Sequence, residues 1–252
     1  MIEIKKPLNI MGLRTLWNEA FGDDDKFLDT FFGTAFSDER CMALYFNNEL
    51  ASALYWFECE LKGKKIAYIY AVATDKKFRG CGFCRQLMEN THKTLSVLGF
   101  SAAVLVPSSK ELFNFYETIG YKTCGYLGTI ETQAAEATVP IKKIDNGEYA
   151  RLRRDYLPDH AIIQEKENLD FLSTQADFFC GEDFLLAARI ERGRLYGLEL
   201  LGNTKKAARI TAALTAENGY FRTVGGDIPF CMGIPLTYKP LDFPVHFAFA
   251  FD

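Results

Sequence analysis

The residues with the clearest chemical potential form a glycine turn in the first half of the chain. Arg79, Gly80 and Gly82 separate an apolar run, Ile66 to Val72, from a segment with helical spacing of apolar residues. A glycine turn at a helix start exposes several backbone N–H groups toward one point, and the helix dipole adds partial positive charge there. The sequence therefore predicts a cradle for a phosphate or pyrophosphate.

The elements around this turn follow from the hydrophobic pattern. After the turn, apolar residues recur at three- and four-residue steps, which is the period of one helical face. A strand, a second helix and another strand complete the segment. Before the turn, two amphipathic helices lead into an antiparallel meander of three strands. The predicted helices are Asn9–Phe21 and Lys26–Phe36, the strands are Cys41–Phe46, Leu50–Leu61, Ile66–Thr74 and Ala102–Val106, and the helical face after the turn carries Cys84, Leu87, Met88, Thr91, Leu95 and Leu98.

Composition limits the classes of function. The 252 residues carry a net charge of −4, so no overall basic field attracts nucleic acid. No leader-like segment opens the chain and no apolar run approaches the ~18 residues of a membrane span, so we expect a cytoplasmic protein without a membrane partner. The 22 Phe residues favour aromatic cores over an aromatic-lined cleft. The seven cysteines, an odd number in mostly apolar contexts, indicate reduced thiols.

A second half with a similar order of elements follows residue 130. Residues 131–139 are small and polar, and we interpret them as a linker between a first domain, 1–130, and a second domain, 140–252. Where the first half has two glycines in its turn, the second has only Gly202, so it is predicted to lack the phosphate cradle. Its predicted strands are Pro140–Ile144, Asp183–Ile190, Arg194–Leu201, Gly219–Val224, Cys231–Tyr238 and Pro244–Phe251, and its helices are Asn146–Leu157, Glu165–Phe179 and Thr204–Leu214.

Two motifs in the first half match a known family. Arg79, Gly82 and Cys84 fall on the pattern Gln/Arg-x-x-Gly-x-Gly/Ala, although Cys84 is larger than the usual residue there. The run from Phe115 to Tyr121, FYETIGY, matches the pattern Leu/Phe-Tyr-x-x-x-Gly-Phe/Tyr at the expected distance. With these motifs, residues 1–130 resemble the GNAT acetyltransferase superfamily. The second half resembles a degenerate GNAT-like domain, as in tandem members of the superfamily.

The resemblance implies an α/β fold with a mixed sheet and an N-acetyltransferase activity. Acetyl-coenzyme A would be the co-substrate, no metal would be required, and the acceptor would be the amine of a small molecule or a peptide. Tyr116 matches the tyrosine that protonates the departing thiolate as a general acid. The strand residues Val72, Ala73 and Thr74 match the segment that pairs with the pantetheine arm. The residues whose N–H groups would hold the pyrophosphate are Arg79, Gly80, Cys81, Gly82, Phe83, Cys84 and Arg85.

The sequence offers more than one candidate for the general base. Glu58 and Glu60 share one face of their predicted strand, and we take Glu58 as the candidate base. Both carboxylates could equally be solvent-facing. The terminal carboxylate of Asp252 is a further candidate, and Tyr68 and Tyr70 either line the acceptor site or belong to the core.

Other functions remain open at this stage. The chain could be a non-catalytic sensor of coenzyme A, or an interaction module whose second half recruits a partner. The acidic run Asp23 to Asp25 could bind a cation, but capping of the next helix is the more ordinary role. Cys81 and Cys84 have redox-pair spacing, but no second pair with ligand spacing accompanies them.

Overall fold

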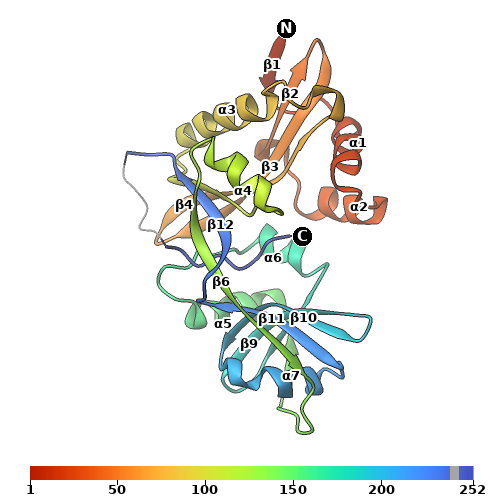
Figure 1. Cartoon of the computed structure of the whole chain (residues 1–252), viewed down its shortest axis with the longest axis vertical. Helices are drawn as coiled ribbons and strands as arrows, with labels where there is room; N and C mark the ends of the chain where they lie inside the picture. The colour runs from red at the N-terminus through yellow and green to blue at the C-terminus, as the bar shows by residue number, and fades with distance from the viewer. Residues whose placement is uncertain (239–243, 252) are drawn as a thin grey trace. The chain divides into compact units, whose positions relative to one another are not determined.

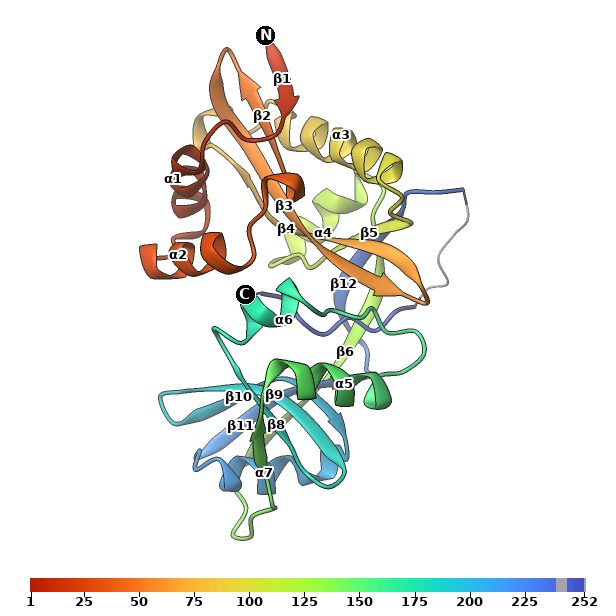
Figure 2. The ribbon, with the colours of Figure 1, turned by 180° about the vertical axis from the view of Figure 1, so that it is seen from behind.

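A computed structural model describes residues 1–238 and 244–251. The chain divides into two compact units. Unit 1 comprises Met1–Thr123 and Met232–Leu241, and unit 2 comprises Cys124–Cys231 and Asp242–Asp252. Figure 1 and Figure 2 show the ribbon from two opposite sides. Each unit contains both parallel and antiparallel strand pairs and is described separately below.

Unit 1 contains the segment around the glycine turn. Its helices are α1 (Ile10–Phe21), α2 (Asp25–Thr34), α3 (Phe83–Val97) and α4 (Lys110–Glu117). Its strands lie in the order β1 (Ile2–Lys5), β2 (Cys41–Phe46), β3 (Glu49–Leu61), β4 (Lys64–Thr74) and β5 (Ala102–Leu105), followed by β12 (Ile228–Pro235). The meander β1 to β4 is antiparallel, and β5 runs parallel to β4. The predicted sequence of elements from residue 1 to residue 105 is therefore confirmed.

The two faces of this sheet have different covers. Helices α1 and α2 cover one face and α3 the other (Figure 1). On the first face, Trp17 lies 4.6 Å from Phe31 and 5.2 Å from Tyr55, measured between ring centroids. On the second face, Leu87 and Met88 of α3 are fully buried. The high aromatic content therefore fills a core, as the composition indicates.

Unit 2 repeats this architecture. Its helices are α5 (Asn146–Tyr156), α6 (Glu167–Leu172) and α7 (Ala207–Ala213). Its strands lie in the order β6 (Lys122–Gln133), β11 (Asn218–Val224), β10 (Arg194–Gly202), β9 (Phe184–Glu191), β8 (Asp177–Cys180) and β7 (Lys142–Ile144). The order β7-α5-α6-β8-β9-β10-α7-β11 repeats the order β1-α1-α2-β2-β3-β4-α3-β5. In both units the last two of these strands are parallel.

In each unit, the last strand in the order comes from the other half of the sequence. Strand β6 follows the first half but pairs with β11 from Leu127 to Gln133. Residues Met232–Pro235 of β12 follow the second half but pair with β5. The chain therefore passes between the units at Thr123 and again at Cys231. The predicted linker, residues 131–139, begins inside β6, because the polar alternation of that segment belongs to a strand with one exposed face.

Several predicted boundaries are wrong. The helix predicted over Glu165–Phe179 ends at Leu172, because residues 177–180 form β8, where Phe178 stacks on Tyr149 of α5. The strand predicted over Pro244–Phe251 makes only isolated bridges at Val245 and His246. Leu98 lies beyond the end of α3 and is exposed. Short apolar runs do not distinguish helix from strand by periodicity alone, so tertiary packing decides between them.

None of the helices that the structure describes is both long and apolar enough to cross a membrane.

Candidate active site

The glycine turn opens α3 as the sequence predicts. Gly82 is the N-cap of α3 with φ of 76°, and no side chain caps the helix there. Gly80 also has a positive φ, 80°. The first N–H groups of α3 have no intrahelical acceptor, so they point to the space in front of the helix. A Cβ atom built on Gly80 or Gly82 would meet nothing within 4 Å, so this space is open.

Basic side chains surround the turn and partly position it. The Nε of Arg79 donates to the carbonyl oxygen of Thr74 at 3.2 Å, which ties the turn to the end of β4. Arg85 donates to the carbonyl and the hydroxyl of Thr118 at 2.7 and 2.8 Å, which joins α3 to the end of α4. Lys77 forms an ion pair with Glu49 at 2.6 Å. The turn therefore combines unpaired backbone donors with a local excess of positive charge, as an anion site requires.

Strand β4 separates from β5 as it approaches the turn. Its ladder with β5 covers only Ile66 to Tyr68, whereas β4 continues to Thr74. A bulge opposite β3 accompanies the separation, and Ala71 there has φ of 47°. Alanine in this conformation is strained, and such bulges re-aim backbone groups. The predicted pantetheine segment follows the bulge directly: Val72 and Thr74 are half-buried, and Ala73 is buried.

Tyr116 of α4 lies against the start of α3. Its side chain is buried, and burial together with the nearby Cys84 thiol raises the pKa of its hydroxyl well above the usual value. Burial likewise raises the pKa of Cys84 to about 11, although Arg85 and a hydrogen bond to Thr74 act in the opposite direction. The Thr74 hydroxyl also lies 2.9 Å from the Ser52 hydroxyl. The structure therefore brings the turn and the end of β4 together with Tyr116, which is far from both in the sequence.

The size of Cys84 does not close the turn. Its thiol is hydrogen-bonded to Thr74 of β4 and faces Tyr116 of α4. The Cys84 thiol also lacks the lowered pKa typical of reactive cysteines, because burial raises its pKa. All seven cysteines are free thiols, and Cys41, Cys59, Cys124 and Cys231 are buried.

Glu58 is set apart from this group. It pairs in register with Ala67, four residues before the bulged Ala71, which is about 13 Å along the strand at ~3.3 Å per residue. Its exposed carboxylate forms an ion pair with Lys65 at 3.3 Å. Tyr68 and Tyr70 lie on the face of the sheet that α1 and α2 cover, in the aromatic cluster around Phe57. Asp252 lies outside the described residues.

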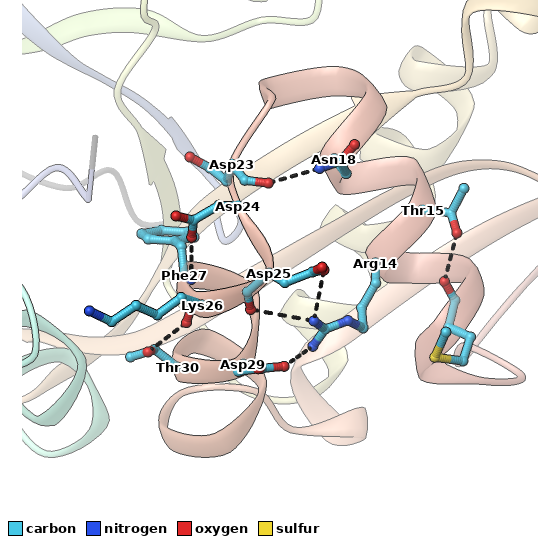
Figure 3. A network of polar contacts seen from close by, with 11 residues as sticks. Arg14, Thr15, Asn18, Asp23, Asp24, Asp25, Lys26, Phe27, Asp29 and Thr30 are labelled. Atoms are coloured by element: carbon cyan, nitrogen blue, oxygen red, sulfur yellow. Dashed lines mark hydrogen bonds and ion pairs between the residues drawn. The ribbon is translucent and has the colours of Figure 1, made fainter.

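The acidic run after α1 has structural partners (Figure 3). Asp24 caps α2 by accepting a hydrogen bond from the Phe27 N–H at 2.8 Å. Asp23 accepts from the Trp17 indole at 2.7 Å, and Asp25 lies 3.3 Å from Arg14. Within the residues that the structure describes, no group of three His, Cys, Asp or Glu side chains is placed to hold a metal ion. The capping interpretation of this run is confirmed.

The equivalent turn of unit 2 is filled. Gly202 has φ of 81°, but a Cβ atom there would lie 2.3 Å from the Asp183 carbonyl oxygen and 2.7 Å from the Tyr156 ring. The Asp183 carboxylate forms an ion pair with Lys206 and accepts a hydrogen bond from Asn203 at 2.9 Å. The Asp183 backbone and the Tyr156 ring therefore fill the space beside Gly202, which is the last residue of β10, whereas the N-cap of α7 is Lys206. No glycine opens α7 as Gly82 opens α3.

Sequence reasoning missed two features of the site region. The bulge at Ala71 has no glycine, asparagine or proline to signal it. The second feature is the contact of His92, whose Nε2 lies 2.8 Å from the Tyr121 hydroxyl, and burial lowers the pKa of His92 to about 4. The GY pair at the end of the second motif gives the only sequence signal for this contact.

Comparison with known proteins first defines the fold. A GCN5-related N-acetyltransferase from Kribbella flavida is 15% identical with a TM-score of 0.73, and the alignment covers 94% of this chain and 72% of that one. A GCN5-related N-acetyltransferase from Anabaena variabilis is also 15% identical, with a TM-score of 0.72 and coverage of 94% and 73%. Eis1 from Mycobacterium abscessus is 10% identical, with a TM-score of 0.66 and coverage of 94% and 74%. The chain therefore has the fold of these proteins over both units.

The family is given by a sequence model. The model of the acetyltransferase (GNAT) domain matches residues 8–124, which include the glycine turn, the bulged strand and Tyr116. This part of the chain matches the GNAT acetyltransferase domain family. None of the curated proteins matches the chain.

Proposed function

We propose that the protein transfers an acetyl group from acetyl-coenzyme A to a primary amine. The observation that carries this proposal is the open start of α3, where Gly80 and Gly82 leave space in front of unpaired backbone donors. The residues present fit a pyrophosphate, because a Cβ atom at either glycine would project into free space instead of into packed protein. In this proposal the N–H groups of residues 79–85 hold the pyrophosphate. Those of Arg79 and Cys81 also donate to the carbonyl oxygens of Lys76 and Phe78, so the start of α3 supplies the principal donors. Val72, Ala73 and Thr74 of β4 pair with the pantetheine arm.

The thioester supplies an activated carbonyl and a leaving group. The amine nitrogen attacks this carbonyl carbon, the new C–N bond forms, the C–S bond breaks, and the sulfur leaves with the bonding electron pair and accepts a proton. A backbone N–H of β4 next to the bulge is the proposed donor to the carbonyl oxygen. Among the described residues it has no ladder partner on the β5 side, and the rigid strand holds it in a fixed direction. No covalent intermediate with the protein is needed in this scheme.

Tyr116 is the proposed general acid. Since burial raises its pKa, the hydroxyl is protonated at neutral pH and can donate to the departing sulfur. The raised pKa also makes full transfer to a thiolate of pKa ~8.5 unfavourable. We therefore expect the hydrogen bond from Tyr116 to stabilise the developing thiolate, with proton transfer completed as the amine releases its own proton.

The general base and the acceptor complete the proposed reaction. Glu58 remains the candidate base, acting through water, and its ion pair with Lys65 would have to open during the reaction. The acceptor is proposed to be the primary amine of a small molecule or a peptide.

The test of Tyr116 is the variant Tyr116→Phe, with Tyr126→Phe as the matched control on an exposed tyrosine. Loss of a positioned general acid lowers turnover by about 10²- to 10⁴-fold, whereas the affinity for acetyl-coenzyme A should change less than about threefold. Turnover is measured as thiol release with a panel of primary amines, and affinity by titration. Equal turnover in Tyr116→Phe and Tyr126→Phe would refute the assigned role.

A non-catalytic sensor of coenzyme A is the second candidate, because Cys84 departs from the small residue usual in the turn. Both candidates predict that acetyl-coenzyme A raises the melting temperature by mass action. The enzyme additionally predicts amine-dependent thiol release. Absence of a thermal shift at about millimolar ligand would exclude both.

A further inference from the structure

A hollow of about 440 Å³ opens on one face of the sheet of unit 2. Three arginines (Arg189, Arg194 and Arg222), two tyrosines (Tyr196 and Tyr220) and Glu131 contribute to its lining. None of these residues belongs to the glycine turn, to β4 or to α4. The volume falls in the range of about 300–1,000 Å³ that is typical of small-molecule sites.

The register of the sheet builds this lining. Arg189 of β9 is paired with Tyr196 of β10, Tyr196 with Tyr220 of β11, and Tyr220 with Glu131 of β6. Residues paired across strands share a face, so these four side chains form one row across the sheet. Their sequence neighbours Leu195 and Phe221 point to the opposite face and pack in the core with α7. The hollow is therefore a property of the fold and does not depend on the conformation of a loop.

The row has a charged side and an aromatic floor. The guanidinium of Arg194 lies 5.4 Å from the ring centroid of Tyr196 and 6.0 Å from that of Tyr220. Stacking of this kind holds a guanidinium flat while its edge stays available for hydrogen bonds. Arg194 also forms an ion pair with Glu131 at 3.2 Å, but the Glu131 carboxylate is largely exposed, so the attraction is weak. The Nε of Arg194 is buried and has no hydrogen-bond acceptor among the described protein atoms.

The charge of the lining is positive. Three guanidinium groups against one carboxylate give +3 − 1 = +2. Glu191 pairs with Arg189 at 2.8 Å from outside the lining, and counting it still leaves +1. This excess occurs in a chain whose net charge is −4, so it is a local feature that favours an anion.

We propose that this hollow binds a small organic anion that combines a planar ring with a phosphate or carboxylate group. The ring packs on Tyr196 and Tyr220, and the anionic group accepts hydrogen bonds from Arg194 and its two neighbouring arginines. The site is separate from the proposed coenzyme site, since all of its lining belongs to unit 2 and the glycine turn belongs to unit 1.

The experiment uses the full-length protein and isothermal titration with phenyl phosphate and benzoate. Inorganic phosphate is the control without a ring, and phenol is the control without a charge. We expect at least one of the two ring-bearing anions to bind at least about tenfold more tightly than phosphate or phenol. Saturation with coenzyme A should leave this binding unchanged.

Variants then assign the binding to the hollow. Arg194→Gln should weaken binding by about tenfold or more, because it removes a charge-assisted contact. Arg192→Gln, in the exposed hairpin turn next to it, removes the same charge outside the lining and should have no effect. Arg222→Gln gives a second test if Arg194→Gln lowers the melting temperature.

Three results would overturn the proposal. The first is no binding of phenyl phosphate or benzoate up to about 10 mM, which is weaker than a specific small-molecule site should give. The second is displacement of the ligand by coenzyme A, which would place it in the coenzyme site. The third is equal loss of affinity in Arg192→Gln and Arg194→Gln. None of these results bears on acetyl transfer, so failure here is distinguishable from failure of the proposed function.

Discussion

The buried ion pair of unit 2 gives the sharpest prediction of stability. The Nε of Arg153 lies 2.7 Å from Glu199 Oε2, and both side chains are only 1% exposed. The Tyr149 hydroxyl donates to the same oxygen at 2.8 Å, and His246 Nε2 lies 3.8 Å from the other oxygen. The next residue, Arg154, forms an exposed ion pair with Glu165 at 2.6 Å. Arg153→Met and Arg154→Met therefore remove neighbouring charges on one helix in opposite environments.

The expected loss in Arg153→Met is large. Removing one partner of a buried ion pair costs about 3–5 kcal/mol, because the other charge remains buried without compensation. Burial alone raises the pKa of Glu199, but Arg153 and His246 outweigh burial and lower it from 4.5 to about 2. The exposed pair of Arg154 is worth about 0–1 kcal/mol.

The assay must report on unit 2. Both tryptophans, Trp17 and Trp56, lie in unit 1, so their fluorescence follows unit 1, whereas far-ultraviolet circular dichroism follows both units. With a slope of about 2 kcal/mol per M urea, Arg153→Met should lower the midpoint of unit 2 by about 1.5–2.5 M, and Arg154→Met by less than about 0.5 M. Equal midpoints in the two variants would refute the reasoning.

The pH dependence provides a second reading of the same pair. Because the folded pKa of Glu199 is lowered, its contribution to stability is complete above pH ~4.5 and is lost as the pH falls toward ~2. In Arg153→Met, burial dominates and this contribution should disappear. The triple variant Arg153→Met, Glu199→Leu, Tyr149→Phe removes the carboxylate together with its arginine and tyrosine partners and should recover most of the lost stability. A triple variant less stable than Arg153→Met would contradict this explanation.

Two further predictions concern unit 1. Gly82→Ala should weaken acetyl-coenzyme A binding and destabilise the free protein by about 1–2 kcal/mol, because its φ of 76° is strained for alanine. Gly33→Ala, in the last turn of α2 with open space around it, should instead stabilise the protein by up to about 0.5–1 kcal/mol. Thermal melts with and without acetyl-coenzyme A distinguish the two variants. Burial lowers the pKa of His92 from 6.5 to about 4, so the unfolded chain binds the proton more tightly and stability should fall by up to about 3 kcal/mol as the pH drops from ~6.5 to ~4. His92→Gln, which can still reach the Tyr121 hydroxyl, should show a smaller fall over this window in urea titrations, and an unchanged fall would count against the burial of His92.

The elements of unit 1 could be predicted from the sequence because local signals agree with the fold. The limits of β2 are predicted to the residue, and Asn9 and Asp24 cap α1 and α2 as their positions indicate. The aromatic residues around Trp17 form a core because α1 and α2 cover one face of the sheet. In such segments periodicity, caps and turns all indicate the same element.

Other features depend on partners that are distant in the sequence. The end of β6 is polar and read as a linker, but pairing with β11 makes it a strand. The bulge at Ala71 arises from the mismatch between the β3 and β4 ladders, which a single sequence does not show. The Arg153–Glu199 pair joins residues 46 positions apart, and the hollow of unit 2 requires the register of four strands. Sequence reasoning identified the glycine turn and Tyr116 by motif, but it could not predict that Cys84 faces both Thr74 and Tyr116.

Comparison of the two glycine turns explains why one repeated architecture need not give two coenzyme sites. Both units place a parallel strand pair, a turn with a left-handed glycine and a helix in the same order. In unit 1 the glycine at the helix start is open, and α3 extends for 15 residues. In unit 2, the Asp183 backbone and the Tyr156 ring fill the space beside Gly202, which ends β10. The N-cap of α7 is Lys206 and α7 has only 7 residues, so no glycine opens this helix toward a ligand. The second unit has instead kept a positive charge on the open part of its sheet, where Arg194 stacks on Tyr196, and any ligand of unit 2 is more readily accommodated there than at its glycine turn.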